Sequence, residues 1–99
     1  MEFTVIKRSG EDGHIIPMTS EDILIGRGSD CDIRVYLETV SRKHCHIRIR
    51  NDQALLTNLS DNPGQTMLNQ EAMDWKETLV LKHGDVITVG DRSLRFSYP

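Results

Sequence analysis

The sequence lacks the long hydrophobic runs of membrane-spanning and secreted proteins. No stretch of its 99 residues approaches the roughly 20 apolar residues that cross a bilayer, and the amino terminus has no apolar run of signal-peptide type. Cysteine is scarce too, since Cys31 and Cys45 are too few for a disulfide framework. We therefore expect a globular domain that makes no membrane contact and works in a reducing compartment, the cytosol or the nucleus.

Helical periodicity is also absent, because no segment gives a convincing amphipathic helix. There is no internal repeat, low-complexity run or linker either. Apolar and polar residues instead alternate with a period of two, most clearly in segments 44–50 and 92–98. Further short strands are predicted at 3–6, 23–25, 33–35, 55–57, 78–81 and 85–89. Many short strands separated by turn residues predict one all-β domain, a sandwich or a barrel.

The charge of the chain excludes one class of partner. The formal net charge is −3, so bulk electrostatics do not attract nucleic acid, and we expect no direct nucleic-acid contact. The charge is uneven, however, because residues 27–50 contain six basic and three acidic side chains. This segment is either a set of solvated strand faces or a local site for an anion.

Two residue types of nucleophilic catalysis occur close together, at Ser41 and His44. Their spacing at a loop-to-strand junction does not require the two side chains to face each other, and no Gly-x-Ser-x-Gly nucleophile elbow is present. A triad is defined by geometry, and most chains contain these residue types by chance. We therefore expect no catalytic residues and no enzymatic activity.

Four potential metal ligands also lie within a short distance in sequence: Cys31, His44, Cys45 and His46. They lack the Cys-x-x-Cys or His-x-x-x-His spacing that is typical of zinc sites. In an alternating strand, His44 and His46 share one face while Cys45 lies on the opposite, apolar face. The pattern favours Cys45 and Cys31 as small core residues, and we expect neither a metal nor a cofactor.

An anion site is the remaining chemical possibility. The stretch Gly26-Arg27-Gly28 is neither a dinucleotide fingerprint nor a P-loop, but it leaves an arginine between two residues without side chains. A hydroxyl at Ser41 and cations at Arg42 and Lys43 would complement it. Charge-assisted hydrogen bonds together with a hydroxyl are what a phosphate group needs.

Three motifs in a fixed order resemble those of the forkhead-associated (FHA) domain family: Ile25-Gly26-Arg27, Ser41-x-x-His44 and a polar turn that ends in Asn69. The segments 30–33 and 81–88 extend the resemblance over essentially the whole chain. Within the family, the sequence is most similar to the FHA domains that begin nuclear proteins of mitotic chromosomes, and next to those of DNA-damage mediator proteins. The resemblance implies that residues 1–99 form a single FHA domain, the amino-terminal module of a longer nuclear protein.

The resemblance also implies a fold and a function. The fold is a β-sandwich of about eleven strands whose loops, at one end, bind phosphothreonine in threonine-phosphorylated segments of partner proteins. Arg27 would be the main phosphate ligand, Ser41 would donate its hydroxyl, and Arg42 and Lys43 would add charge. His44 would hold the binding loops without touching the phosphate, and Gly26 and Gly28 would allow close approach of the backbone.

The third loop departs from the family pattern. Residues 58–69 are one residue longer than the usual Thr-Asn-Gly-type loop. Aligned from the left, Asn62 occupies the threonine position and Pro63, which has no N–H or amide, occupies the asparagine position. Aligned from the right, Thr66 and Asn69 match the family. Asn62 is therefore the candidate for gripping the peptide backbone, unless it only forms a turn, and Thr66 and Asn69 are expected to fix the loop.

A second function remains open at this point, a homo-oligomerisation module that works largely without phosphate. The apolar residues Met67, Leu68, Met73 and Trp75 lie near the variable loop and would form the surface of a homodimer. The alternative is that they pack into the core of the domain.

Overall fold

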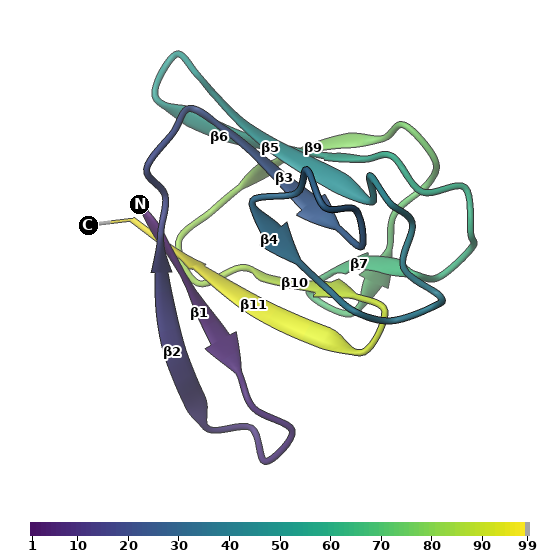
Figure 1. Ribbon diagram of the computed structural model, residues 1–99. Coiled ribbons are helices and arrows are strands. Elements are labelled where there is room, and N and C mark those ends of the chain that lie inside the picture. The colour runs from purple at the N-terminus through teal and green to yellow at the C-terminus, as the bar shows by residue number, and fades with distance from the viewer. Residues whose placement is uncertain (99) are drawn as a thin grey trace.

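The computed structural model describes residues 1–98, which form two β-sheets packed face to face (Figure 1). All the regular elements in this part of the chain are strands, eleven in number, so the expected all-β sandwich is confirmed. No helix among the described residues is long and apolar enough to span a membrane. The strands are β1 (Glu2–Ile6), β2 (Asp12–Pro17), β3 (Asp22–Gly26), β4 (Ile33–Arg34), β5 (Cys45–Arg50), β6 (Gln53–Asn58), β7 (Thr66–Leu68), β8 (Glu71–Ala72), β9 (Thr78–Leu81), β10 (Val86–Val89) and β11 (Arg92–Ser97).

The sheets have six and five strands. The first runs β2-β1-β11-β10-β7-β8 and the second β4-β3-β5-β6-β9. Every pairing within the described chain is antiparallel except that of β3 with β4, which is parallel. Because β1 pairs with β11, with Glu2 opposite Ser97, the two ends of the chain lie side by side (Figure 1).

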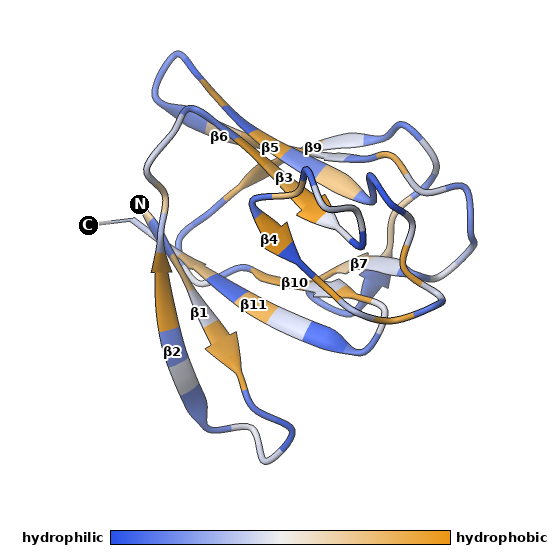
Figure 2. Ribbon diagram, in the orientation of Figure 1, coloured by the Kyte–Doolittle hydropathy of each residue, from blue (hydrophilic) through white to orange (hydrophobic). Residues whose placement is uncertain are grey.

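The core lies between the two sheets, and hydrophobic residues are concentrated on the strands (Figure 2). Phe3 and Phe96 are fully buried, with their ring centroids 5.5 Å apart across the β1–β11 pair. Ile47, Leu56 and Ile87 are also fully buried. Burying one such side chain contributes about 1.5–3 kcal/mol, so the alternation of β5 and β11 stabilises the fold directly.

Three strands, β2, β7 and β8, lie outside the segments that the sequence predicts. β2 is an edge strand with a register shift against β1 between Thr4 and Ile6. Four of its six residues are exposed, so no two-residue hydrophobic period marks it. β8 has two residues, both exposed. Short edge strands are held by backbone pairing rather than by burial, and hydrophobic patterns do not detect them.

Burial settles several expectations about single residues. Cys45 is fully buried, as predicted, whereas Cys31 is only half-buried, and the prediction that it is a core residue is wrong. Cys31 lies in the loop after β3, where its thiol donates a hydrogen bond to the carbonyl oxygen of Arg42 (3.0 Å). Met73 is 5% exposed and belongs to the core, while Trp75 is 58% exposed. Of the four apolar residues named for an oligomerisation surface, Met73 therefore belongs to the core and Leu68 packs against it, while Trp75 is exposed.

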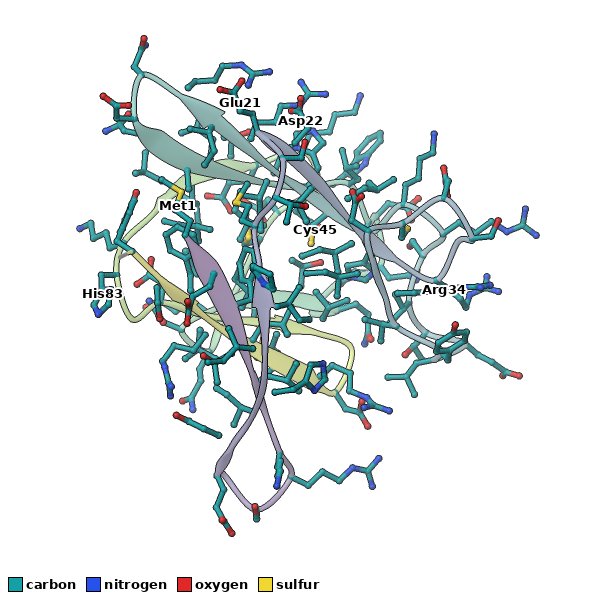
Figure 3. The ribbon with its side chains drawn as sticks, turned by 60° about the vertical axis from the view of Figure 1, so that its left-hand side comes forward. Met1, Glu21, Asp22, Arg34, Cys45 and His83 are labelled. Carbon is teal, nitrogen blue, oxygen red and sulfur yellow. The ribbon has the colours of Figure 1, made fainter. Side chains whose placement is uncertain are left out.

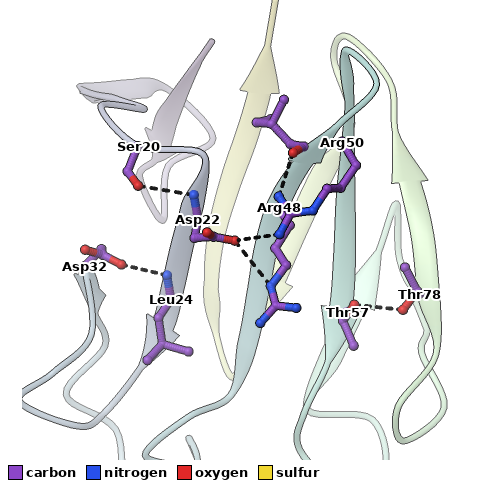
Figure 4. A network of polar contacts seen from close by, with 9 residues as sticks. Ser20, Asp22, Leu24, Asp32, Arg48, Arg50, Thr57 and Thr78 are labelled. Carbon is purple, nitrogen blue, oxygen red and sulfur yellow. Dashed lines mark hydrogen bonds and ion pairs between the residues drawn. The ribbon is translucent and has the colours of Figure 1, made fainter.

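The basic segment 27–50 divides into two groups. Arg48 and Arg50 lie on the outer face of the five-stranded sheet, where Asp22 pairs with both at 3.3 Å and 3.6 Å (Figure 4). These two arginines are solvated strand residues with a nearby carboxylate. The other basic side chains of the segment lie at the end of the sandwich where the β3–β4 and β4–β5 loops meet.

Candidate anion-binding site

The loop after β3 is hydrogen-bonded to the segment that precedes β5. The N–H of Arg27 donates to the carbonyl oxygen of Ser41, and the N–H of Gly28 donates to that of Arg42, both at 3.0 Å. A Cβ atom at Gly26 would collide with the Arg42 carbonyl and lie 2.8 Å from that of Ser41. The glycine is therefore required by close approach of two backbones, and this approach brings the two sequence motifs together.

A cavity of about 560 Å³ opens where these segments meet, and we call it the basic cavity. Four of its lining side chains are cationic and one is anionic. Arg34 projects from this end of the molecule, on the side opposite His83 (Figure 3). The lining residues are Arg27, Gly28, Ser29, Asp30, Arg34, Arg42 and Lys43.

Arg27 is oriented before any ligand arrives. Its Nε atom donates to the carbonyl oxygen of Val40 (3.0 Å), which leaves the two terminal nitrogens for another acceptor. Among residues 1–98, no carboxylate lies within 4.0 Å of Arg27 or Arg42. Lys43, by contrast, is 4.0 Å from Asp30. Two guanidinium groups on one cavity, both without a carboxylate partner, are suited to a multiply charged oxyanion.

Ser41 precedes Arg42 in the chain, and its carbonyl oxygen accepts the N–H of Arg27. Its Oγ atom donates to Oγ of Ser60 (3.1 Å), and Ser60 Oγ also accepts the N–H of Asn62 (3.3 Å). The side chain of Asn62 is exposed, and no hydrogen bond joins its carboxamide to the described residues. Asn62 therefore lies next to the serine pair, in the loop between β6 and β7, with its amide available to a ligand.

His44 joins the loops through a buried hydrogen-bond chain. The backbone N–H of Ser41 donates to His44 Nδ1 (3.0 Å), so the neutral ring carries its proton on Nε2. That nitrogen lies 3.0 Å from the carbonyl oxygen of Gln65 and 2.7 Å from Oγ1 of Thr66. His44 is fully buried, and burial lowers its pKa, opposed by the hydrogen bond to Gln65.

The chain continues into Asn58, a residue that the sequence analysis did not single out. Thr66 Oγ1 donates to Asn58 Oδ1 (2.7 Å), and the Asn58 amide nitrogen donates to the carbonyl oxygens of Ser60, Met73 and Asp74 at 3.0–3.3 Å. Asn58 and Ser60 are each 2% exposed. One signal existed, because Ala54, Leu56 and Asn58 share the buried face of β6, and a polar residue in that series must be hydrogen-bonded.

Asn69 lies elsewhere. It occupies the β7–β8 turn with a positive φ of 52°, and its carboxamide bonds Asp85 Oδ1 (3.0 Å) and the N–H of Val86 (2.8 Å). These contacts fix the turn at the end of β7 away from Thr66. The structure therefore brings Thr66 to the loops of the site and places Asn69 outside them.

Catalytic and metal chemistry have no geometric support in residues 1–98. Ser41 contacts His44 through its backbone N–H, while its hydroxyl bonds Ser60, so no nucleophile–base pair exists there. No group of three or more His, Cys, Asp or Glu side chains in this range is placed to hold a metal ion. Burial raises the pKa of Cys45 to about 12, which keeps that thiol protonated and unreactive.

Comparison with known proteins agrees with this geometry. The family model of the FHA domain matches residues 23–90. The proliferation marker protein Ki-67 is 49% identical in human and 45% identical in mouse over 92 residues, which cover 92% of this chain and 3% of each relative. The chain thus corresponds to a small part of these proteins.

Two solved structures illustrate the likeness in three dimensions. A chain from a structural and functional analysis of phosphothreonine-dependent FHA domain interactions is 27% identical, with a TM-score of 0.78 and coverage of 100% of this chain and 98% of that one. The amino-terminal FHA domain of Rad53p from S. cerevisiae, in complex with a phosphothreonine peptide, has a TM-score of 0.83 at 23% identity. It covers 100% of this chain and 94% of its own, a likeness of fold.

Proposed function

The chain belongs to the FHA domain family, and we propose on that basis that it is a phosphothreonine-dependent protein–protein interaction module. It would recognise threonine-phosphorylated segments of partner proteins and catalyse no reaction. The observation that carries the proposal is that Arg27 and Arg42 line the basic cavity, and that neither arginine has a carboxylate partner within the described chain. Ser41 lies next to both, since its carbonyl oxygen accepts the N–H of Arg27 and it precedes Arg42 in the chain. Similar domains of known structure take part in phosphothreonine-dependent interactions.

The roles of the residues follow from their contacts. Arg27, fixed through Nε, would direct its terminal nitrogens at two phosphate oxygens. Ser41 would turn its hydroxyl from Ser60 to a third oxygen, Arg42 and Lys43 would add charge, and Asn62 would bond the peptide backbone. Gly26 and Gly28 admit the crossing segment, and the His44–Thr66–Asn58 chain holds the loops in place.

We expect a large preference for phosphothreonine over unmodified threonine and a small preference for phosphothreonine over phosphoserine. A phosphothreonine carries close to two negative charges and three strong acceptors that threonine lacks. Hydrogen bonds to charged groups contribute about 1.5–3 kcal/mol each, so two of them give roughly a hundredfold discrimination or more. The extra methyl of threonine over serine is worth only about 1 kcal/mol by buried area.

We further propose that the domain works in the nucleus, within a cell-cycle or DNA-damage-response protein. The support is the similarity to Ki-67, a proliferation marker, and to the FHA domain of Rad53p. Partners would then be nuclear proteins phosphorylated on threonine.

A degenerate peptide library tests the function. The domain is titrated with matched sets that carry phosphothreonine, phosphoserine or unmodified threonine at the fixed position, and sedimentation is measured with and without the selected peptide. Phosphothreonine-selective binding by a monomer supports the proposal. Self-association that ignores phosphate would instead identify an oligomerisation module.

A further inference from the structure

Arg34 is the cation of the basic cavity that the motifs do not account for. It ends β4, and the parallel pairing of β3 with β4 sets it beside Gly26, one residue before Arg27. Its Nε atom donates to the carbonyl oxygen of Arg27 (2.9 Å). The side chain is thus hydrogen-bonded to the backbone of the main candidate phosphate ligand, on the side of the molecule opposite His83 (Figure 3).

Tyr36 fixes the same guanidinium from a second side. The guanidinium carbon of Arg34 lies 4.7 Å from the centre of the Tyr36 ring, a distance at which the cation is attracted to the ring face. Tyr36 itself is 73% exposed, so its placement is not explained by core packing. Because Nε of Arg34 is bonded to the Arg27 carbonyl and the guanidinium lies over the Tyr36 ring, its terminal nitrogens are left for an acceptor outside the domain.

The distribution of ion pairs sets Arg34 apart from the arginines on the rest of the surface. Five arginines have a carboxylate within 4.0 Å: Arg8, Arg48, Arg50, Arg92 and Arg95. The remaining three, Arg27, Arg34 and Arg42, have none among residues 1–98, and all three line the basic cavity. In a chain with a net charge of −3, acidic side chains are in excess, yet they leave this cavity's arginines without partners.

A single phosphate does not balance this charge. Four cations and Asp30 line the cavity, a net charge of +3. A phosphothreonine supplies about −1.5 to −2, so a charge of about +1 to +1.5 is left. The remaining positive charge is about that needed to bind one carboxylate. Arg34 is the candidate to bind it, because its guanidinium is oriented by the Arg27 carbonyl and the Tyr36 ring.

We propose that Arg34 is a second anion-binding residue of the basic cavity, and that it selects partner segments carrying an Asp or Glu side chain within reach of the phosphothreonine. This inference rests on the proposed function, because the phosphothreonine sets the register of the peptide. Arg34 then determines which phosphorylated threonines are preferred, while Arg27 and Ser41 determine that the threonine must be phosphorylated.

The test is a double-mutant cycle between protein and peptide. A phosphothreonine peptide is scanned with Asp and then Asn at each flanking position, and its affinity is measured for the wild type, Arg34→Gln and Arg34→Lys. Arg8→Gln is the matched control, because it removes the same charge from a side chain that is 86% exposed and does not line the basic cavity. Each variant is also titrated with the unphosphorylated peptide.

The wild type and Arg8→Gln are expected to prefer Asp over Asn by about fivefold at one flanking position, the size of a favourable partly exposed ion pair. Arg34→Gln loses that preference and keeps its selectivity for phosphothreonine over threonine, and Arg34→Lys keeps part of the preference. An unchanged preference in Arg34→Gln, or an equal loss for the Asp and Asn peptides, overturns the role of Arg34 alone. A wild type that ignores phosphate overturns the proposed function as well.

Discussion

The backbone N–H of Ser41 donates to Nδ1 of His44 at 3.0 Å, which makes the position of Ser41 dependent on the protonation state of a buried histidine. A neutral ring accepts this bond and donates from Nε2 to Thr66 and Gln65. A protonated ring would have a second donor at Nδ1, which would face the N–H of Ser41. The geometry therefore requires the neutral form, in agreement with the lowered pKa of His44.

Folding stability is accordingly expected to fall in mild acid. Burial lowers the pKa of His44 from the ordinary 6.5, so the unfolded chain binds the proton first as the pH drops below about 6.5. The free energy of unfolding decreases from there to the folded-state pKa and levels off below it, by at most about 1.4 kcal/mol per pH unit. His46, whose pKa burial also lowers, contributes in the same direction.

Two measurements separate the histidines. The first is urea unfolding of the wild type and of His46→Gln between neutral and mildly acid pH. The pH dependence of the unfolding free energy that remains in His46→Gln is assigned to His44. The second is an NMR titration, which measures the pKa of His44 directly. A His44 pKa at or above the ordinary value would contradict the neutral hydrogen-bond chain.

Asn58→Ala tests the buried connection between the loops. Removing the carboxamide takes one hydrogen bond from each of the carbonyls of Ser60, Met73 and Asp74, from the N–H of Ser60 and from the Thr66 hydroxyl. We therefore expect a loss of about 2–4 kcal/mol in unfolding free energy. Phosphopeptide affinity should fall with it, because Ser60 and Ser41 lose their common support. Asn69→Ala is the matched control and should lower stability but leave affinity within about twofold, since Asn69 bonds only the distant turn. Equal affinity losses in the two variants would place Asn69 within the site after all.

Gly26→Ala should disable the site by displacing a backbone. A Cβ atom there would overlap the carbonyl of Arg42, so the 41–43 segment must shift, at a cost of about 1–3 kcal/mol, and phosphopeptide affinity should fall about tenfold or more. Gly84→Ala is the control, because Gly84 has a positive φ of 89° but open space around it. It is expected to lose about 1 kcal/mol of stability and no affinity. Peptide affinity is measured by calorimetry. An unchanged affinity in Gly26→Ala would show that the close contact between Gly26 and the 41–43 segment does not position the site.

The serine pair gives a graded prediction. Ser41→Ala removes a hydroxyl that would donate to the phosphate and should weaken binding about tenfold or more. Ser60→Ala removes the partner of Ser41 Oγ and of the Asn62 N–H but no group that would bond the phosphate, and it should cost clearly less. Fluorescence anisotropy with a labelled phosphopeptide ranks the two, and a larger loss in Ser60→Ala would reverse the assigned roles.

The sequence predicts most of the sandwich because burial on one face of a strand leaves a two-residue period, as at Ile47 and Phe96. It does not predict β2 or β8, whose residues are held by edge pairing and carry little burial. The small, apolar side chain of Cys31 predicts a core position, but the residue lies in a loop between two aspartates, where its thiol donates to the Arg42 carbonyl.

The residues of the candidate site that belong to a sequence motif can be predicted. Those whose role depends on contacts between segments far apart in sequence cannot. Arg27, Ser41 and His44 stand out in sequence, and the structure brings them together. Asn58 and Ser60 do not. Asn58 is held by the carbonyl oxygens of residues 73 and 74 in a remote loop, and Ser60 by Ser41. In sequence, Arg34 is one of several basic residues in segment 27–50, and only the pairing of β4 with β3 sets it beside Arg27.

The proposed function depends most on Arg27, which would bind the phosphate on threonine. The most direct measurement is the affinity of one peptide, with and without its phosphate, for the wild type and Arg27→Ala, with circular dichroism confirming that both are folded. We expect a preference of roughly a hundredfold or more for the phosphorylated peptide in the wild type and its near-complete loss in Arg27→Ala. Equal affinity of the wild type for both peptides, or an undiminished preference in Arg27→Ala, would contradict it.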